Sequence, residues 1–241
     1  MTQPSQCVRR LSATAGDIAI AANILRAGGL VAFPTETVYG LGADARNDAA
    51  VQKLFAAKAR PPGKALIVLV QDLFEAALYG VFDEPARLLA GAYWPGALTL
   101  IVKRRKGCAL SAEINPDGAT VALRAPGNET AMTLLRAFAG PLTAPSANPS
   151  GAEAPESAEE VLNGLGSAID AVLWETPPSF EQQGVPTEAG LRLENIVRTL
   201  SGGDRPAFEQ GFRGGYYNVV MGTGGRDGTV NGILARNSFG N

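Results

Sequence analysis

The chain has 241 residues, of which 46% are hydrophobic and 18% charged, and its formal net charge is −2. This length suits one sizeable core, and the near-neutral charge provides no overall basic field that would attract nucleic acid. Because the sequence contains no histidine, it excludes a Ser-His-Asp triad, histidine acid–base catalysis and histidine metal sites.

The two cysteines, Cys7 and Cys108, fit neither a disulfide framework nor the spacing of zinc ligands. No apolar run reaches 18 residues, and residues 1–10 lack the apolar core of a signal peptide. We therefore expect a cytoplasmic protein that makes no contact with a membrane.

Hydrophobic patterns and capping residues predict helices and strands that alternate along the chain. Asp48, Asn128 and Ser157 are expected to be N-caps, and Gly140 is expected to close the helix that precedes it. The predicted helices are 17–27, 48–57, 72–78, 85–93, 128–137 and 157–165. The predicted strands are 28–32, 65–70, 98–102, 120–124, 141–144 and 169–174. This alternation is typical of a layered α/β fold.

Residues 33–44, Phe-Pro-Thr-Glu-Thr-Val-Tyr-Gly-Leu-Gly-Ala-Asp, form the most informative stretch of the sequence. Hydroxyl groups and a carboxylate follow directly after an apolar strand, and in α/β sheets the carboxyl ends of strands are where ligands usually bind. Two glycines then allow a close approach of the backbone. The alternative interpretation is a simple turn after an edge strand.

Four further motifs follow in order. They are Lys58-Ala59-Arg60-Pro61, Tyr93-Trp94-Pro95-Gly96-Ala97-Leu98-Thr99, Thr120-Val121-Ala122-Leu123-Arg124 and Thr143-Ala144-Pro145-Ser146-Ala147-Asn148-Pro149-Ser150-Gly151. Together with the first stretch, this set resembles the YrdC-type family, the threonylcarbamoyl-AMP synthases of tRNA modification. The resemblance covers about residues 15–175. It implies an α/β fold with a twisted, open mixed sheet, flanking helices and a concave ligand-binding face.

The resemblance also implies a domain organisation. Residues 1–14 would be an N-terminal extension and 15–201 a single YrdC-like catalytic domain. Residues 202–241 are rich in glycine and are expected to be irregular or flexible. Within them, residues 222–228 fit neither the Walker pattern nor the dinucleotide-binding fingerprint.

The reaction implied by the resemblance joins L-threonine, bicarbonate or CO2, and ATP into threonylcarbamoyl-AMP and pyrophosphate. The carbamate, the triphosphate and the threonine carboxylate are all negative, so fixed cations are required, together with Mg2+ on the phosphates. No metal site within the protein is expected. The implied partners are downstream tRNA threonylcarbamoyl transferase proteins, which use the product.

By this resemblance, Lys58 and Arg60 are catalytic residues that clamp the ATP phosphates. Arg124 holds the threonine carboxylate, and Thr35 and Tyr39 belong to the threonine pocket. Each residue also has a structural interpretation. The two cations would be solvated at a helix end, Arg124 would be a strand exit, and the other two would be a turn hydroxyl and a core ring.

Three further residues are expected at the ATP site. Ser146 and Asn148 match the family's Ser-x-Asn motif, although short polar side chains suit a tight turn equally well. Thr120 lies on the same strand face as Arg124, four residues earlier, and is expected to touch the nucleotide.

The sequence departs from the family pattern near its C-terminus. Glu194, Asn195 and Glu209 stand where the family usually has a serine, a threonine and an arginine, and an acid near the triphosphate would repel it. The alternative functions are therefore a non-catalytic RNA- or nucleotide-binding module with weak RNA contact, a carbamoyl-adenylate-forming domain like that of hydrogenase-maturation carbamoyltransferases, and an inactive family member. The net charge of −2 argues against RNA binding.

Overall fold

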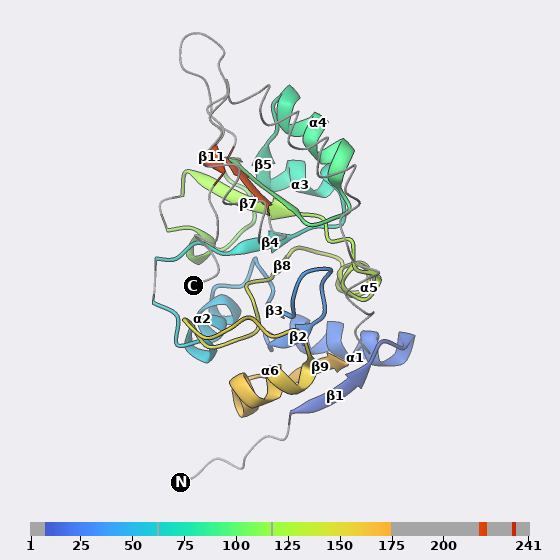
Figure 1. Cartoon of the computed structure of the whole chain (residues 1–241). Helices are drawn as coiled ribbons and strands as arrows, with labels where there is room; N and C mark the ends of the chain where they lie inside the picture. The colour runs from blue at the N-terminus through green and yellow to red at the C-terminus, as the bar shows by residue number, and fades with distance from the viewer. Residues whose placement is uncertain (1–7, 62, 117, 175–216, 221–232, 235–241) are drawn as a thin grey trace.

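The computed structural model describes residues 8–61, 63–116, 118–174, 217–220 and 233–234 (Figure 1). The helices are α1 (Ala15–Arg26), α2 (Asp48–Ala57), α3 (Leu73–Tyr79), α4 (Glu84–Tyr93), α5 (Glu129–Phe138) and α6 (Ala158–Leu165). The strands are β1 (Arg9–Ser12), β2 (Val31–Phe33), β3 (Gly40–Gly42), β4 (Ile67–Leu69), β5 (Gly80–Val81), β6 (Leu98–Arg104), β7 (Thr120–Arg124), β8 (Leu142–Thr143), β9 (Ala171–Trp174), β10 (Tyr217–Val220) and β11 (Ile233–Leu234).

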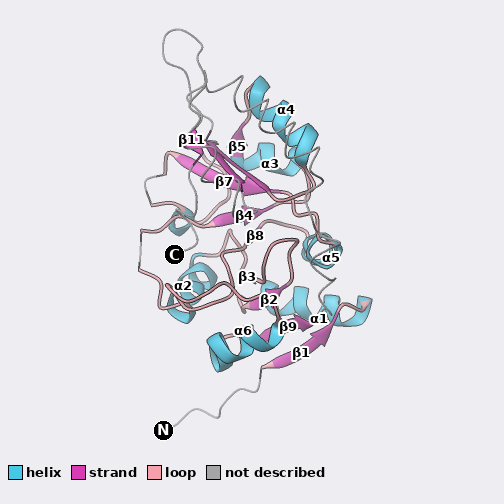
Figure 2. Ribbon diagram, viewed as in Figure 1, coloured by secondary structure: helices cyan, strands magenta, loops and turns pink. Residues whose placement is uncertain are grey.

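The strands form two mixed sheets. The first has the order β1-β9-β2-β3, in which only β3 is antiparallel to its neighbour. The second has the order β11-β10-β6-β7-β4-β8, and β5 also pairs with β6. Figure 2 shows α1 and α6 beside the first sheet, and α3 and α4 beside the second. The expected mixed sheet flanked by helices is confirmed, but it is divided into two parts.

The two sheets are joined where residues 39–45 run antiparallel to residues 141–147. Isolated bridges pair Gly40 with Ser146 and Asp44 with Leu142. The Thr143 hydroxyl, which is fully buried, accepts from the Ala43 N–H at 2.9 Å and donates to the Leu41 carbonyl at 3.2 Å. This junction places the loop that precedes β3 beside the loop that follows β8.

The buried side chains form two hydrophobic clusters. The larger includes Leu54 of α2, Leu100 of β6 and Val172 of β9. The smaller joins α1 and α5 to β2 and includes Leu25 and Leu135. Burial of this apolar surface fixes the helices against the sheets and so sets the positions of the loops at the sheet junction.

Local capping explains most helix boundaries. Asn128 and Ser157 are N-caps as expected, since their side chains accept from the N–H groups of residues 131 and 160. The expected cap at Asp48 is wrong: the neighbouring Asn47 accepts from the Ala50 N–H. At the end of α5 the left-handed residue is Ala139, with φ of 60°, rather than Gly140.

Part of the predicted C-terminal tail lies within the described residues. There β10 pairs parallel to β6, and β11 pairs antiparallel to β10. The divergent positions Glu194, Asn195 and Glu209 lie outside the described residues. Among the helices that the structure describes, none is long and apolar enough to cross a membrane.

Candidate active site

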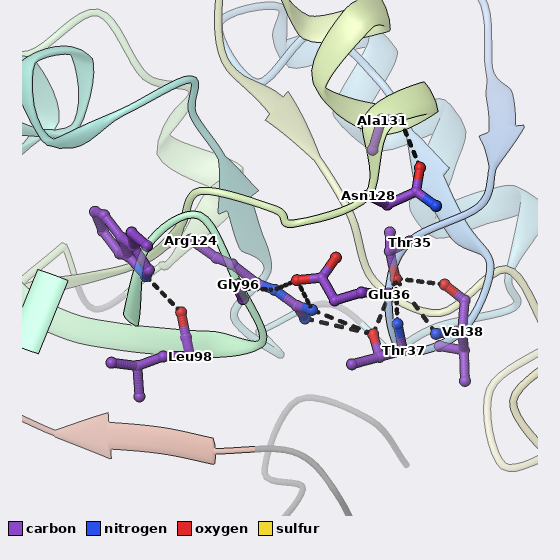
Figure 3. A network of polar contacts seen from close by, with 10 residues as sticks. Thr35, Glu36, Thr37, Val38, Gly96, Leu98, Arg124, Asn128 and Ala131 are labelled. Atoms are coloured by element: carbon purple, nitrogen blue, oxygen red, sulfur yellow. Dashed lines mark hydrogen bonds and ion pairs between the residues drawn. The ribbon is translucent and has the colours of Figure 1, made fainter. Parts of the chain in front are cut away.

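A hydroxyl group organises the loop between β2 and β3. Thr35 Oγ1 lies 2.6 Å from the Val38 carbonyl oxygen and 2.9 Å from Thr37 Oγ1, and it accepts from the N–H groups of both residues. A serine or threonine that bonds its own backbone in this way stabilises a tight turn. The loop therefore presents Glu36 and Thr37 in a fixed arrangement (Figure 3).

Arg124 lies at the carboxyl end of β7 and is 7% exposed. Its Nη2 lies 2.6 Å from Glu36 Oε1, and its Nε donates to the same oxygen at 3.2 Å and to the Gly96 carbonyl at 3.1 Å. Both Nη atoms also reach Thr37 Oγ1, at 3.4 Å. The guanidinium thus joins three segments that are distant in the sequence (Figure 3).

The carboxylate of Glu36 remains charged in this setting. Burial alone would raise its pKa, but the Arg124 charge and the nearby Gly127 N–H outweigh burial and lower the pKa. Although this N–H favours the charged form, Glu36 Oε2 is buried and has no partner within hydrogen-bond geometry. The site therefore contains an ion pair in which one carboxylate oxygen is poorly satisfied.

Lys58 is the C-cap residue of α2, and only 1% of it is exposed. Its ammonium donates to the main-chain carbonyl oxygens of Ser146 and Asn148, and its own carbonyl accepts from the Ser150 N–H at 2.8 Å. Burial, with a smaller contribution from the Arg60 charge, lowers the pKa of Lys58 to about 7. The two carbonyl oxygens favour the charged form and oppose this effect. Lys58 is therefore a buried cation beneath the loop that follows β8.

The same loop contains an unsatisfied acceptor. Asn148 is 4% exposed, and its Nδ2 donates to the carbonyls of Pro149 and Ala152 at 3.0 and 2.7 Å. Its Oδ1 is buried and lacks a hydrogen-bond partner among the described residues. Arg60 is 6% exposed and donates to the Ala65 carbonyl at 3.0 Å.

The remaining predicted site residues lie in structural settings. Tyr39 is 3% exposed and belongs to the larger hydrophobic cluster. Thr120 accepts from Asn115 Nδ2 at 3.1 Å at the start of β7, about 13 Å along the strand from Arg124. The sheet junction brings Thr35 and Ser146 close together, because both flank Gly40.

Glu36 and Thr37 were not singled out as site residues by sequence reasoning. The available signal was their place in a run of hydroxyl and carboxylate side chains directly after β2. Within the described part of the chain, no group of three or more histidine, cysteine or carboxylate side chains could hold a metal ion.

A separate surface pocket of about 420 Å3 lies away from these groups. Its lining residues are Arg9, Ile24, Ala27, Gly28, Gly29, Lys53 and Asp170. Asp170 accepts from Lys53 and from the Leu30 N–H, both at 2.7 Å. Because its carboxylate already has these two donors, the pocket offers no comparable binding group.

Comparison with a family model gives a match over residues 23–184, to the Sua5, YciO and YrdC group that is described as "Telomere recombination". Threonylcarbamoyl-AMP synthase of Bacillus subtilis is 44% identical over 188 residues, which are 78% of this chain and 51% of that protein. The Pyrococcus abyssi enzyme of the same name is 40% identical over 200 residues, covering 76% of this chain and 57% of that one. The chain thus spans little more than half the length of these two relatives.

A shorter relative is the threonylcarbamoyl-AMP synthase of Idiomarina loihiensis, 36% identical over 61% of this chain and 80% of its own. Among solved structures, Sua5 of P. abyssi complexed with L-threonine has a TM-score of 0.66 at 36% identity, covering 69% of this chain and 49% of that one. The E. coli YciO structure has a TM-score of 0.62 at 26% identity, covering 72% and 84% respectively.

Proposed function

This chain belongs to the Sua5, YciO and YrdC family, and we propose that it is an L-threonylcarbamoyladenylate synthase. It would join L-threonine, bicarbonate or CO2, and ATP into threonylcarbamoyl-AMP and pyrophosphate. The main support is that relatives at 36–44% identity are named threonylcarbamoyl-AMP synthases. The reaction also suits a histidine-free site built from buried cations, hydroxyls and backbone groups.

Arg124, Thr35 and Tyr39 are assigned to the threonine end of the site. Arg124 is a buried cation whose 3.4 Å contacts with Thr37 are long enough to be replaced by a stronger acceptor. A carboxylate is that acceptor, since it forms charge-assisted bonds with a guanidinium. One solved relative, P. abyssi Sua5, is described in complex with L-threonine.

Lys58 and Arg60 are assigned to the ATP end as catalytic residues, together with Thr120, Ser146 and Asn148. The Lys58 ammonium lies beneath the loop of residues 146–148, where it holds the loop in place and provides positive charge for the phosphates. The unsatisfied Oδ1 of Asn148 would accept a hydrogen bond from a hydroxyl or amino group of the nucleotide.

The steps follow from these assignments. The threonine nitrogen attacks the carbon of CO2 and forms a carbamate. A carbamate oxygen then attacks the α-phosphorus of ATP, and pyrophosphate leaves. The cations at both ends of the site lower the cost of bringing these negative groups together. Mg2+ would be held by the phosphates of ATP, since these are its usual ligands in such sites.

The product would be used by tRNA threonylcarbamoyl transferase proteins, and the enzyme would work in the cytoplasm. The alternative of an RNA- or nucleotide-binding module is disfavoured by the net charge of −2 and by the names of the relatives. The direct test is mass spectrometry of a reaction containing ATP, Mg2+, bicarbonate and L-threonine. Formation of threonylcarbamoyl-AMP would support the proposal, and its absence while ATP still binds would favour the nucleotide-binding alternative.

A further inference from the structure

The ion pair between Glu36 and Arg124 is uneven. Glu36 Oε1 receives both contacts from Arg124, at 2.6 Å from Nη2 and 3.2 Å from Nε. A guanidinium and a carboxylate that pair most strongly use two nitrogens and two oxygens. Here the second oxygen, Oε2, is buried and has no hydrogen-bond partner among the described residues. Such an oxygen is costly to leave unsatisfied, so it is a candidate acceptor for a donor supplied by a ligand.

The guanidinium also retains binding capacity. It carries five N–H donors, and the contacts of Nη1 in the described part of the chain are confined to Thr37 Oγ1 at 3.4 Å. A distance of this length indicates a weak bond. Arg124 can therefore donate to a further acceptor without losing Glu36.

The pair lies just beneath the surface rather than deep in the core. The side chains are 8% exposed for Arg124 and 17% exposed for Glu36. Figure 3 shows both side chains meeting Thr37 at the point where the 34–39 loop approaches the end of β7. A small molecule would therefore meet one positive and one negative group together.

We propose that Glu36 is a specificity-determining residue that recognises the amine of an α-amino acid, while Arg124 recognises its carboxylate. This inference rests on the proposed function, because it identifies how the threonine end of the same site would select its substrate. An α-amino acid carries its ammonium and carboxylate on one carbon, so its charges are complementary to an adjacent Glu–Arg pair. After carbamate formation the nitrogen keeps one N–H, which can still donate to Glu36.

The pair would also discriminate against simple anions. A carboxylate without an amine gains the attraction of Arg124 but is repelled by Glu36 at a similar distance. A zwitterion satisfies both charges, so it is favoured over its deaminated analogue. Neutralising Glu36 should therefore change selectivity and not only affinity.

The test is calorimetric binding of L-threonine and of (3R)-3-hydroxybutyrate, which keeps the carboxylate and the hydroxyl but lacks the amine. The proteins are the full chain with its natural sequence, Glu36→Gln, Glu36→Asp, and the control Glu159→Gln on the exposed face of α6. We expect the natural chain and the control to prefer L-threonine by about tenfold or more, the value of one hydrogen bond to a charged group. In Glu36→Gln this preference should be lost, and Glu36→Asp should retain part of it.

Three results would overturn the inference. If the natural chain binds both compounds equally, Glu36 does not read the amine, and this result needs no variant to fold. If Glu36→Gln weakens both compounds by the same factor, the residue has only a structural role, while threonine binding by the natural chain still supports the proposed function. If the natural chain binds neither compound, both the inference and the proposed threonine site are wrong.

Discussion

The ammonium of Lys58 donates to the carbonyl oxygen of Ser146, 88 residues later in the sequence, and thereby ties the end of α2 to the loop that follows β8. This contact gives Lys58 two roles in the proposed site. It holds the Ser146–Asn148 turn in place, and it places a buried positive charge beneath the region assigned to the ATP phosphates.

Replacing Lys58 or Arg60 by alanine should weaken ATP binding. The expected loss is about 1.5–3 kcal/mol for each residue, the value of a hydrogen bond to a charged group. Calorimetric titration with MgATP measures it, and Lys106→Ala, which removes an exposed lysine, is the matched control. Unchanged ATP affinity in both site variants would contradict the phosphate clamp.

ATP affinity should fall as the pH rises above neutrality. Burial lowers the pKa of Lys58 to about 7, so its charge is present below that pH and is lost above it. Bound phosphate favours the charged form, and the affinity for MgATP should therefore decrease by up to about tenfold per pH unit above pH 7. The measurement is MgATP titration between pH 6.5 and 8.5, compared with Lys58→Met. The variant should show a flat profile, and an equal slope in both proteins would assign the titration to another group.

Replacing Arg124 by alanine should act on threonine and spare ATP. The expected result is a rise in KM for L-threonine by at least about tenfold, because a charge-assisted bond to its carboxylate is lost. The ATP affinity should remain within about twofold of that of the natural sequence. Arg136→Ala, an exposed arginine on α5, serves as the control. A KM for L-threonine that does not change would remove Arg124 from the pocket.

Replacing Thr143 by valine should destabilise the junction between the two sheets. The substitution leaves the Ala43 N–H and the Leu41 carbonyl without their buried side-chain partner. The free energy of unfolding should fall by about 1–3 kcal/mol. Urea denaturation of Thr143→Val and of Thr133→Val, an exposed threonine on α5, provides the comparison. Equal stability of the two variants would show that this hydroxyl does not support the junction.

Local features of the sequence predicted much of the fold. Asn128 and Ser157 begin their helices as expected, because a cap depends on groups only three residues apart. The choice between Asn47 and Asp48 was wrong, since either side chain can accept the required N–H and their local sequences are almost the same.

The organisation of the site was less accessible to sequence reasoning. The partner of Arg124 is Glu36, 88 residues away, and only the packing of the 34–39 loop against the end of β7 brings them together. The partners of Lys58 are main-chain carbonyl groups, which every residue carries and which therefore leave no signal in the sequence. Glu36 was visible in the Pro-Thr-Glu-Thr motif, but its role depends on this tertiary contact.

The most direct test of the proposed activity is pyrophosphate release by the purified full chain with ATP, Mg2+ and bicarbonate, with and without L-threonine. The proposed synthase predicts release that depends on L-threonine and falls sharply in Arg124→Ala. No release in the presence of all substrates, from folded protein that binds ATP, would contradict the proposed synthase.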